Sequence, residues 1–147
     1  MLDIKIKNKD CMPKAASDGS AGMDLRFGVK TAVGYTLLQG GGGISFCTGV
    51  AVAIPLGWVG LLVPRSGFGT KYKVKLDNTL GIIDSDYRGY IRAVITNTGE
   101  KDCIIEDYER ICQLVIVPHY DVTKFNVVEE LSSTNRGSSG FGDSGRQ

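Results

Sequence analysis

Five polar islands, rich in glycine, serine, arginine or aspartate, separate the apolar segments of this chain. Arginine can hold phosphate oxygens through paired hydrogen bonds, and glycine lets backbone N–H groups approach an anion closely. Aspartate can act as a general base or hold the water of a bound metal ion. Together these residue types predict a site for a phosphate-bearing ligand. The islands are SAGMDLR (20–26), PRSGFGTK (64–71), NTLGIIDSDYRG (78–89), YERICQLV (108–115) and RGSSGFGDSG (136–145).

The candidate side chains of these islands are of three chemical kinds. Cationic and hydroxyl groups could bind phosphate, carboxylates could act as base or metal ligand, and rings could cover a base and a sugar. Each island alone also fits an ordinary turn, because Asp and Gly form turns. The candidates are Arg65, Arg136, Ser66, Ser138, Ser139 and Ser144 for phosphate, Asp24, Asp84 and Asp86 as carboxylates, and Tyr87 and Phe141 as rings.

Several familiar catalytic patterns fail their context. GFGDSG (140–145) satisfies G-x-G-x-x-G, but the chain ends too soon for the strand–loop–helix unit that dinucleotide binding requires. GDSG (142–145) is typical of a serine-protease nucleophile, yet the one histidine, His119, belongs to an apolar strand segment. His119 is therefore expected at a strand end and not as a base. The sequence shows no phosphate-binding P-loop motif and no zinc-ligand spacing.

Length and charge exclude whole classes of protein. The chain has 147 residues, which suits a single domain, and a net charge of +1, which argues against stable coating of nucleic acid. Hydrophobic residues at 42% and charged residues at 22% exclude a largely disordered chain. The apolar runs fall short of a membrane span, and no secretory segment follows the first residues. We therefore expect a cytoplasmic protein with no membrane partner.

The segments between the five islands, which must position the candidate residues, have the sequence pattern of β-strands. Twenty glycines leave little room for long helices, and apolar residues recur at every second position. The spacing predicts an all-β sandwich or jelly roll with one helical turn, either near 67–72 or near 107–110. It also predicts a hairpin whose arms are 80–83 and 87–95, and a loop over 39–43. Strands are expected at 2–6, 21–27, 44–55 (broken by Gly49), 58–64, 80–83, 87–95, 103–106, 111–119 and 124–128.

Cysteine usage and the tail complete the organisation. The four cysteines form no CxxC pair, so we expect free and mostly buried thiols in a reducing compartment. Residues 135–147 have almost no apolar surface, so they should form a mobile arm after a domain spanning 1–134. The arm nevertheless contains one phenylalanine and two arginines, which a simple linker does not need.

The five islands resemble, in order and spacing, the five motifs of the homotrimeric dUTP pyrophosphatase (dUTPase) family. AGMDLR, PRSGFG, GIIDSDYRG, ERICQ and RG-x-x-GFG-x-SG all occur, and the resemblance runs from about Pro13 to the C-terminus. It implies jelly-roll subunits, a trimer with sites shared between subunits, and a tail that closes a site. It also implies Mg2+-dependent hydrolysis of dUTP to dUMP and pyrophosphate. That reaction would limit uracil incorporation into DNA and supply dUMP for dTMP synthesis.

The resemblance also implies roles for the residues around the base and sugar. Asp84 matches the aspartate that deprotonates the water attacking the α-phosphorus. Tyr87 matches the tyrosine beneath the deoxyribose, where it would exclude a 2′-hydroxyl. Asn78 begins the hairpin whose backbone reads uracil, and an unmatched polar group there costs ~1–3 kcal/mol.

The remaining matched residues surround the phosphates. Arg65, Ser66 and Gly67 match the phosphate grip of the second motif, and Gln113 matches the glutamine of the fourth. Asp24 matches the aspartate that organises Mg2+ through water. The tail residues Arg136, Phe141, Gly142 and Ser144 match the γ-phosphate clamp, the lid over uracil, a backbone donor and a phosphate hydroxyl.

Departures and alternatives accompany this resemblance. Ser139 and Asp143 stand where the family often has other residues, and Asp143 would place negative charge near the phosphates. For Asp86 we expect a turn role rather than catalysis. A dCTP deaminase would need a glutamate just after the hairpin tip, and 89–94 contain none. A regulatory or partner-binding protein on the same scaffold, or a trimeric structural protein, are the alternatives from other classes.

Overall fold

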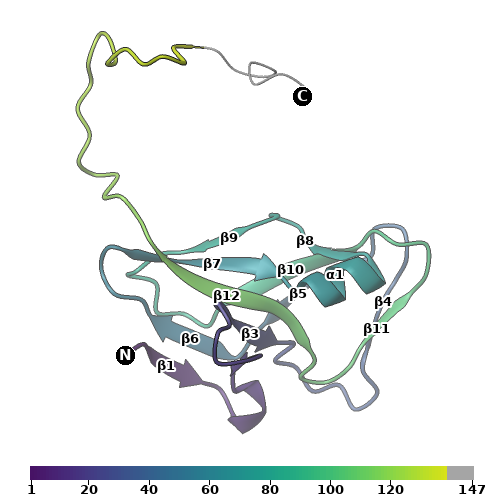
Figure 1. Cartoon of the computed structure of the whole chain (residues 1–147). Helices are drawn as coiled ribbons and strands as arrows, with labels where there is room; N and C mark the ends of the chain where they lie inside the picture. The colour runs from purple at the N-terminus through teal and green to yellow at the C-terminus, as the bar shows by residue number, and fades with distance from the viewer. Residues whose placement is uncertain (139–147) are drawn as a thin grey trace.

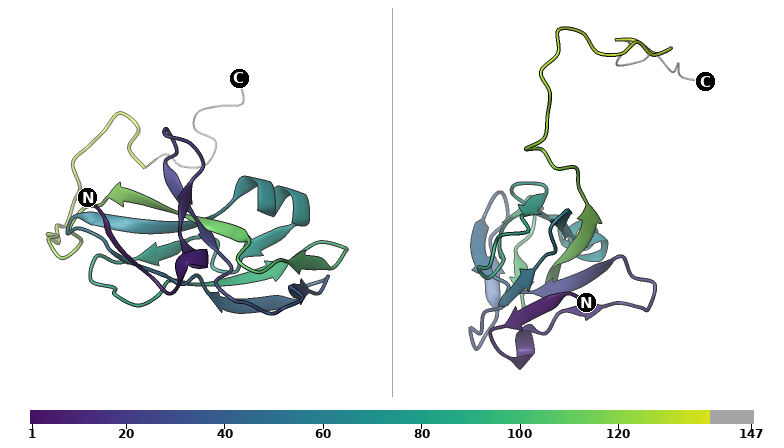
Figure 2. Two further views of the ribbon diagram at one scale, coloured as in Figure 1. Left: turned by 90° about the horizontal axis from the view of Figure 1, so that it is seen from below. Right: turned by 90° about the vertical axis from the view of Figure 1, so that its left-hand side faces the viewer.

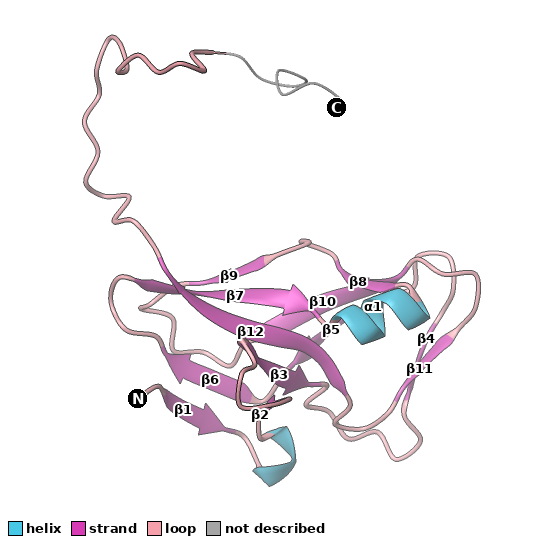
Figure 3. Ribbon diagram, in the orientation of Figure 1, coloured by secondary structure: helices cyan, strands magenta, loops and turns pink. Residues whose placement is uncertain are grey.

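Short β-strands make up most of the regular structure in the computed structural model, which describes residues 1–138 (Figures 1 and 3). The described residues contain a single α-helix, so the expected all-β class is confirmed. The elements are β1 (Asp3–Ile6), the 3-10 helix η1 (Lys9–Cys11), β2 (Lys14–Ala15), β3 (Gly22–Arg26), β4 (Tyr35–Leu37), β5 (Gly43–Cys47), β6 (Val50–Ala53), β7 (Trp58–Pro64), α1 (Ser66–Tyr72), β8 (Val74–Leu76), β9 (Gly81–Ile83), β10 (Arg92–Asn97), β11 (Cys103–Ile105) and β12 (Arg110–Pro118).

Two antiparallel sheets carry the fold. The larger has the order β2-β3-β12-β7-β9 and the smaller the order β5-β10-β8, while β1 pairs with β6 and β11 with β4. Most neighbouring strands are far apart in the sequence, which is consistent with the expected jelly roll. Strand β12 lies in the middle of the larger sheet and pairs along its length with β3 and β7.

The hydrophobic core joins the two sheets. Buried and more exposed residues alternate along strands such as β8, β10 and β11, as the two-residue period requires. The rings of Phe27 and Phe46 pack with centroids 5.0 Å apart. Fully buried side chains come from both sheets, among them Leu25, Leu62 and Leu114 of the larger and Phe46, Leu76 and Ile95 of the smaller.

Several local expectations are confirmed. The strand predicted at 58–64 is β7, and the helical turn predicted near 67–72 is α1. The long apolar segment from Ile44 breaks at Gly49, where φ is +73° and a Cβ would lie 2.3 Å from the Cys11 sulfur. Only glycine fits that position without displacing its neighbour.

Two expectations are wrong. Residues 80–83 and 87–95 do not form a hairpin, because β9 pairs with β7 whereas β10 pairs with β5 and β8. Their apolar side chains belong to different sheets, so the chain between them forms an open loop. The strand predicted at 124–128 is also absent, since that segment is exposed and finds no partner strand within the described chain. Residues 107–110 contain a turn and no helix.

Residues 119–138 leave the end of β12 and run out from the body without helix or strand (Figures 1 and 2). Nearly all of their side chains are exposed, including the apolar side chains Phe125, Val127 and Leu131. In the part of the chain that the structure describes, no helix is long and apolar enough to cross a membrane.

Candidate functional site

A buried carboxylate shared by two arginines lies at one end of the larger sheet. Asp24 on β3 is 6% exposed, and its Oδ2 accepts from Arg65 Nε at 3.0 Å and from Arg110 Nη1 at 3.1 Å. Arg65 Nη1 also donates to the backbone carbonyl of Arg110 at 2.9 Å. A buried carboxylate is costly unless it is paired, so these contacts fix all three side chains.

Strand register brings this cluster together. Asp24 of β3 lies opposite Gln113 of β12, which lies opposite Val63 of β7. Strand β7 ends at Pro64, and Arg65 is the N-cap residue of α1, from which its guanidinium reaches Asp24. Gln113 Nε2 donates to the Pro64 carbonyl at 3.2 Å, which ties the second and fourth motifs together.

The start of α1 offers further donors beside the cluster. Ser66 and Gly67 are exposed in its first turn. The first backbone N–H groups of a helix have no partner inside the helix and carry partial positive charge. Together with Arg65 they form a surface suited to phosphate oxygens.

Beneath the cluster lies an apolar thiol. Burial, and then the negative charge of Asp24, raise the pKa of Cys112 to about 12, although Arg65 opposes the rise. The thiol is therefore neutral near pH 7. This neutral thiol makes the surroundings of Asp24 less polar, so the ion pairs of Asp24 with Arg65 and Arg110 are stronger than they would be in water.

The second half of the candidate site surrounds Asp84, directly after β9. Its side chain is exposed and lines a pocket of about 180 Å³ together with Ile82, Ile83, Tyr87 and Arg92. A second pocket of about 280 Å³ shares Asp84 and also includes Trp58, Val59, Ile82, Ser85, Val122 and His119, which follows the end of β12 as expected.

Backbone contacts hold the loop that carries Asp84. Tyr87 N–H donates to the Asp84 carbonyl at 3.2 Å, and the Tyr87 hydroxyl donates to the Tyr90 carbonyl at 3.0 Å. Arg88 Nη1 donates to the carbonyls of Ser85 and Tyr87. A Cβ at Gly89 would lie 2.5 Å from the Tyr87 hydroxyl oxygen, so the ring needs glycine beneath it. Asp86 lies in the turn, as expected.

The two halves are far apart within one subunit. Ile83 of β9 pairs with Gly60 of β7, so Asp84 lies at the level of Val59. Asp24 lies at the level of Val63, which is four residues further along β7. Four residues span about 13 Å, and the three strand spacings from β9 to β3 add about 14 Å across the sheet. A separation of about 20 Å prevents Asp84 and Arg65 of one chain from contacting the same phosphate group.

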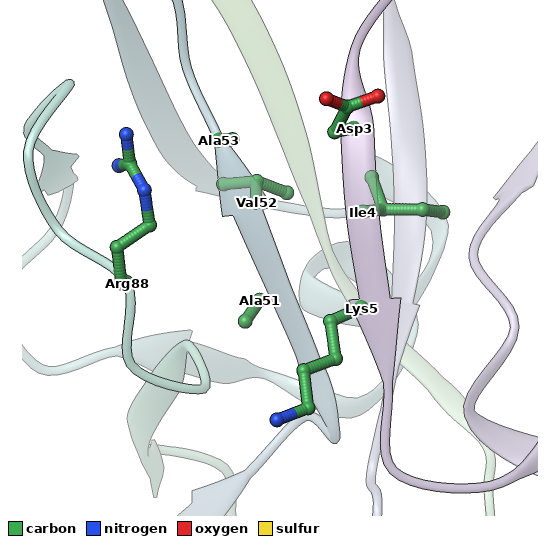
Figure 4. Close-up of a pocket in the computed structure, with 7 residues that line it drawn as sticks. All are labelled: Asp3, Ile4, Lys5, Ala51, Val52, Ala53 and Arg88. Carbon is green, nitrogen blue, oxygen red and sulfur yellow. The ribbon is translucent and has the colours of Figure 1, made fainter.

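A third pocket lies away from both halves. It runs between β1 and β6 and is lined by Asp3, Ile4, Lys5, Ala51, Val52, Ala53 and Arg88 (Figure 4). Arg88 reaches it from the loop that carries Asp84 and is the one lining residue that belongs to the third island. No candidate residue within 1–138 lines this pocket.

The remaining predicted residues fall into two groups. Asn78 is exposed in the turn between β8 and β9, and Arg136 is exposed in the segment that leaves the body. Phe141, Gly142 and Ser144, with the departures Ser139 and Asp143, lie outside the described residues. Sequence reasoning missed Arg110, whose signal was present: it is the one arginine of the fourth island.

The donor groups near Asp24 limit how this site could hold a metal ion. Within residues 1–138, no group of three or more His, Cys, Asp or Glu side chains is arranged to hold a metal ion. Mg2+ at nucleotide sites commonly takes one or two carboxylates, with phosphate oxygens and water completing its shell. Asp24 fits this limited role, since both of its ion pairs use Oδ2 and Oδ1 could accept from a metal-bound water.

Comparisons with known proteins place the chain near one family. The dUTPase family model matches residues 8–145. A deoxyuridine 5'-triphosphate nucleotidohydrolase of Escherichia phage T5 is 48% identical over 147 residues, covering 99% of each chain. A Burkholderia cenocepacia protein of the same name is 40% identical, covering 99% of this chain and 98% of its own. The Staphylococcus bacteriophage 80alpha dUTPase, solved as a G164S mutant with dUpNHpp, has a TM-score of 0.79 at 30% identity, covering 99% and 98% of the two chains.

Proposed function

The chain belongs to the dUTPase family, and from this premise we propose that it hydrolyses dUTP to dUMP and pyrophosphate. The observation that carries the proposal is the pair of half-sites. One is an arginine–carboxylate cluster suited to phosphate, and the other is an exposed aspartate beside a tyrosine-lined pocket. Nucleotide hydrolysis needs both a phosphate grip and a base for water.

In the proposed reaction Asp84 acts as general base. Its carboxylate accepts a proton from a water molecule as the water oxygen attacks the α-phosphorus of dUTP. The new P–O bond forms in line with the bond to the bridging oxygen, which breaks and leaves with pyrophosphate. The exposed carboxylate of Asp84 can reach such a water because no described side chain pairs with it in an ion pair.

The triphosphate would be held by the other half-site. Arg65, Ser66, Gly67 and Gln113 supply donors, and Asp24 holds Arg65 in place. When bound with the nucleotide, Mg2+ would neutralise phosphate charge and make the pyrophosphate a better leaving group. We propose that Asp24 contacts this ion through water.

Sugar, base and tail contacts would provide selectivity. Tyr87 would pack beneath the deoxyribose and exclude a 2′-hydroxyl, and the segment that begins at Asn78 would pair with uracil. The tail (135–147) would close over the nucleotide through Arg136 and Phe141, with Gly142 and Ser144 donating to phosphate. Closure of such a segment would exclude all water except the nucleophile.

The separation of the two half-sites supports a homotrimer with shared sites. Asp84 of one subunit would meet Arg65 of its neighbour, so a cyclic assembly would form three equivalent sites. The four cysteines are free, as expected, and three are buried. Free thiols suit a reducing cytoplasm, where we place the enzyme's role in keeping uracil out of DNA and supplying dUMP.

A partner-binding role is the second candidate. Phage dUTPases, with the Staphylococcus bacteriophage 80alpha enzyme as the example, control transfer of virulence genes. A comparable role here would be additional to hydrolysis. It would persist in an Asp84→Asn variant, whereas pyrophosphate release would not.

Substrate competition tests the proposal. Pyrophosphate release should favour dUTP over dTTP, dCTP and UTP by at least ~100-fold in kcat/KM, a discrimination of ~2.7 kcal/mol. Ammonia is measured in parallel, because a deaminase would release it from dCTP. Comparable hydrolysis of UTP would contradict the role of Tyr87, and absence of dUTP hydrolysis would contradict the function itself.

A further inference from the structure

We propose that Arg110 is a positioning residue that offsets the charge of Asp24 and so directs the charge of Arg65 toward the phosphate chain. The inference rests on the proposed function for the identity of the ligand. It concerns a residue for which the sequence assigned no role.

The geometry makes Asp24 a shared counter-ion. A single oxygen, Oδ2, accepts from both guanidinium groups, and the Asp24 side chain is 9% exposed. Arg65 and Arg110 are more open, at 27% and 35%. Two cations and one anion leave the cluster with a net charge of +1, carried at its solvent side.

Without Arg110 the net charge of the cluster would fall from +1 to zero. Asp24 and Arg65 would then form a pair of zero net charge, and the buried carboxylate would have one cation as its whole compensation. Buried charges interact strongly and are screened little by salt. The attraction between Arg65 and a polyphosphate would therefore fall, although every donor of Arg65 would still be present.

An irregularity in β12 aims Arg110 at this position. The pairing with β3 shifts between Arg110 and Cys112, so Arg110 lies opposite Arg26 and Cys112 opposite Leu25. In a regular strand, residues two apart share a face, yet Cys112 is fully buried while Arg110 is not. Bulges re-aim side chains in this way, and here the bulge puts Arg110 on the Asp24 face.

The backbone of the same residue completes the support. The Arg110 carbonyl accepts from Arg65 Nη1 at 2.9 Å, so Arg65 is held from two sides by one residue and its ion-pair partner. A side-chain substitution at 110 preserves this backbone contact. It therefore removes the charge of Arg110 while keeping one anchor of Arg65.

The test measures binding of three probes by calorimetry: dUpNHpp, inorganic triphosphate and dUMP. Arg110→Gln should weaken dUpNHpp and triphosphate by about tenfold or more, the scale of one charge-assisted interaction. The change for dUMP, with a single phosphate, should be about threefold or less. Arg110→Lys should recover part of the loss because it restores the charge. Lys75→Gln, at an exposed position of β8, is the matched control for a lost cation and should bind as the wild type.

A double-mutant cycle with Asp24→Asn separates positioning from direct phosphate contact. If Arg110 acts by offsetting Asp24, Arg110→Gln should cost about threefold or less in the Asp24→Asn background. An equal loss in both backgrounds, or an equal loss for all three probes, would overturn the inference. If Arg110→Gln fails to fold, Arg110→Met, a second variant that removes the charge but keeps most of the side-chain length, takes its place in the cycle and is judged by the same criteria.

The proposed function is judged separately. Wild-type protein that binds triphosphate but does not hydrolyse dUTP would refute the proposed function, and the triphosphate series would still decide the role of Arg110. Wild-type protein that binds neither nucleotide nor triphosphate would overturn this inference as well.

Discussion

Two aspartates of this chain differ in burial and in ion pairing, and this difference suits them to different roles. Asp24 is buried and paired with two guanidinium groups, whereas Asp84 is exposed at the edge of two open pockets. The Asp24 carboxylate is already engaged by two guanidinium groups, whereas no described side chain forms an ion pair with Asp84. Asp84 is therefore the better candidate for the base, and Asp24 for the holder of Arg65.

Substitution at Asp84 tests this division. Asp84→Asn preserves size but removes the proton acceptor, and loss of a general base typically costs ~10²–10⁴-fold. We expect kcat for dUTP to fall by that factor while binding of dUpNHpp is retained. Asp86→Asn is the matched control in the same loop and should leave kcat nearly unchanged. If instead the Asp86 variant loses kcat and the Asp84 variant keeps it, the base is Asp86.

The cysteines allow a second prediction at the scale of single residues. Cys47 is partly exposed, whereas burial raises the pKa of the thiols of Cys11, Cys103 and Cys112. The thiolate is the reactive form, so Cys47 should react first. With a thiol-specific reagent near pH 8 we expect about one fast thiol per native chain and all four after denaturation. A Cys47→Ser variant that keeps the fast thiol would contradict this.

At the scale of elements, the alternation of apolar and polar residues, together with turn-forming residues, was sufficient to locate single strands along the chain. β7 was located to the residue, and the break at Gly49 followed from a glycine inside an apolar run. Pairing was not predictable in the same way. The hairpin expected across 84–89 failed because local sequence does not reveal that β9 and β10 belong to different sheets. Residues 124–128 alternate like a strand, but no described strand pairs with them.

The hydrogen bonds between Thr31 and Asp107 should make the stability of the protein depend on pH. The backbone N–H of Thr31, and then its hydroxyl, donate to Asp107 and hold the pKa of that carboxyl below its usual value. A lowered folded-state pKa means that the stabilisation is present above the unfolded pKa, near 3.9, and is lost as pH falls through the folded pKa.

The corresponding variant is Asp107→Asn. It should lower Tm by a few degrees at pH 7, because the amide oxygen is a weaker acceptor than the carboxylate. The difference from the wild type should shrink below about pH 4, as the wild-type carboxyl becomes protonated. Thermal unfolding followed by circular dichroism from pH 3 to pH 7 measures both curves. A difference that stays constant across this range would contradict the account.

At the scale of the whole molecule, the Asp24–Arg65 cluster and the Asp84 loop lie too far apart in one chain to contact the same phosphate group. The islands alone predicted the residue types of a phosphate site, and Asp24, Arg65 and Gln113 do lie together. They did not reveal that Asp84 lies about 20 Å away, because that distance depends on strand order and register. They also left Arg110 without a role, since its orientation comes from a bulge that no motif announces.

Mixed assemblies test whether a neighbour supplies the missing half. Asp84→Asn trimers and Arg65→Gln trimers should each be nearly inactive. When the two variants are denatured, mixed in equal amounts and refolded, a site is intact if it takes Asp84 from an Arg65→Gln subunit and Arg65 from an Asp84→Asn subunit. Random assembly of a cyclic trimer gives such a site about one time in four. We therefore expect about a quarter of wild-type activity.

The matched control for this experiment uses two variants within one half-site. Asp84 and Tyr87 belong to the same loop, so a mixture of Asp84→Asn and Tyr87→Ala subunits contains no site in which both residues are intact. That mixture should recover nothing beyond the activity of its parents. Light scattering of each refolded sample should give about three times 15.8 kDa, which shows that assembly itself succeeded. Recovery in neither mixture, with trimers formed in both, would mean that each subunit builds its own complete site. The flanking segment 119–138 or a rearrangement of the Asp84 loop would then have to close the separation seen within one chain.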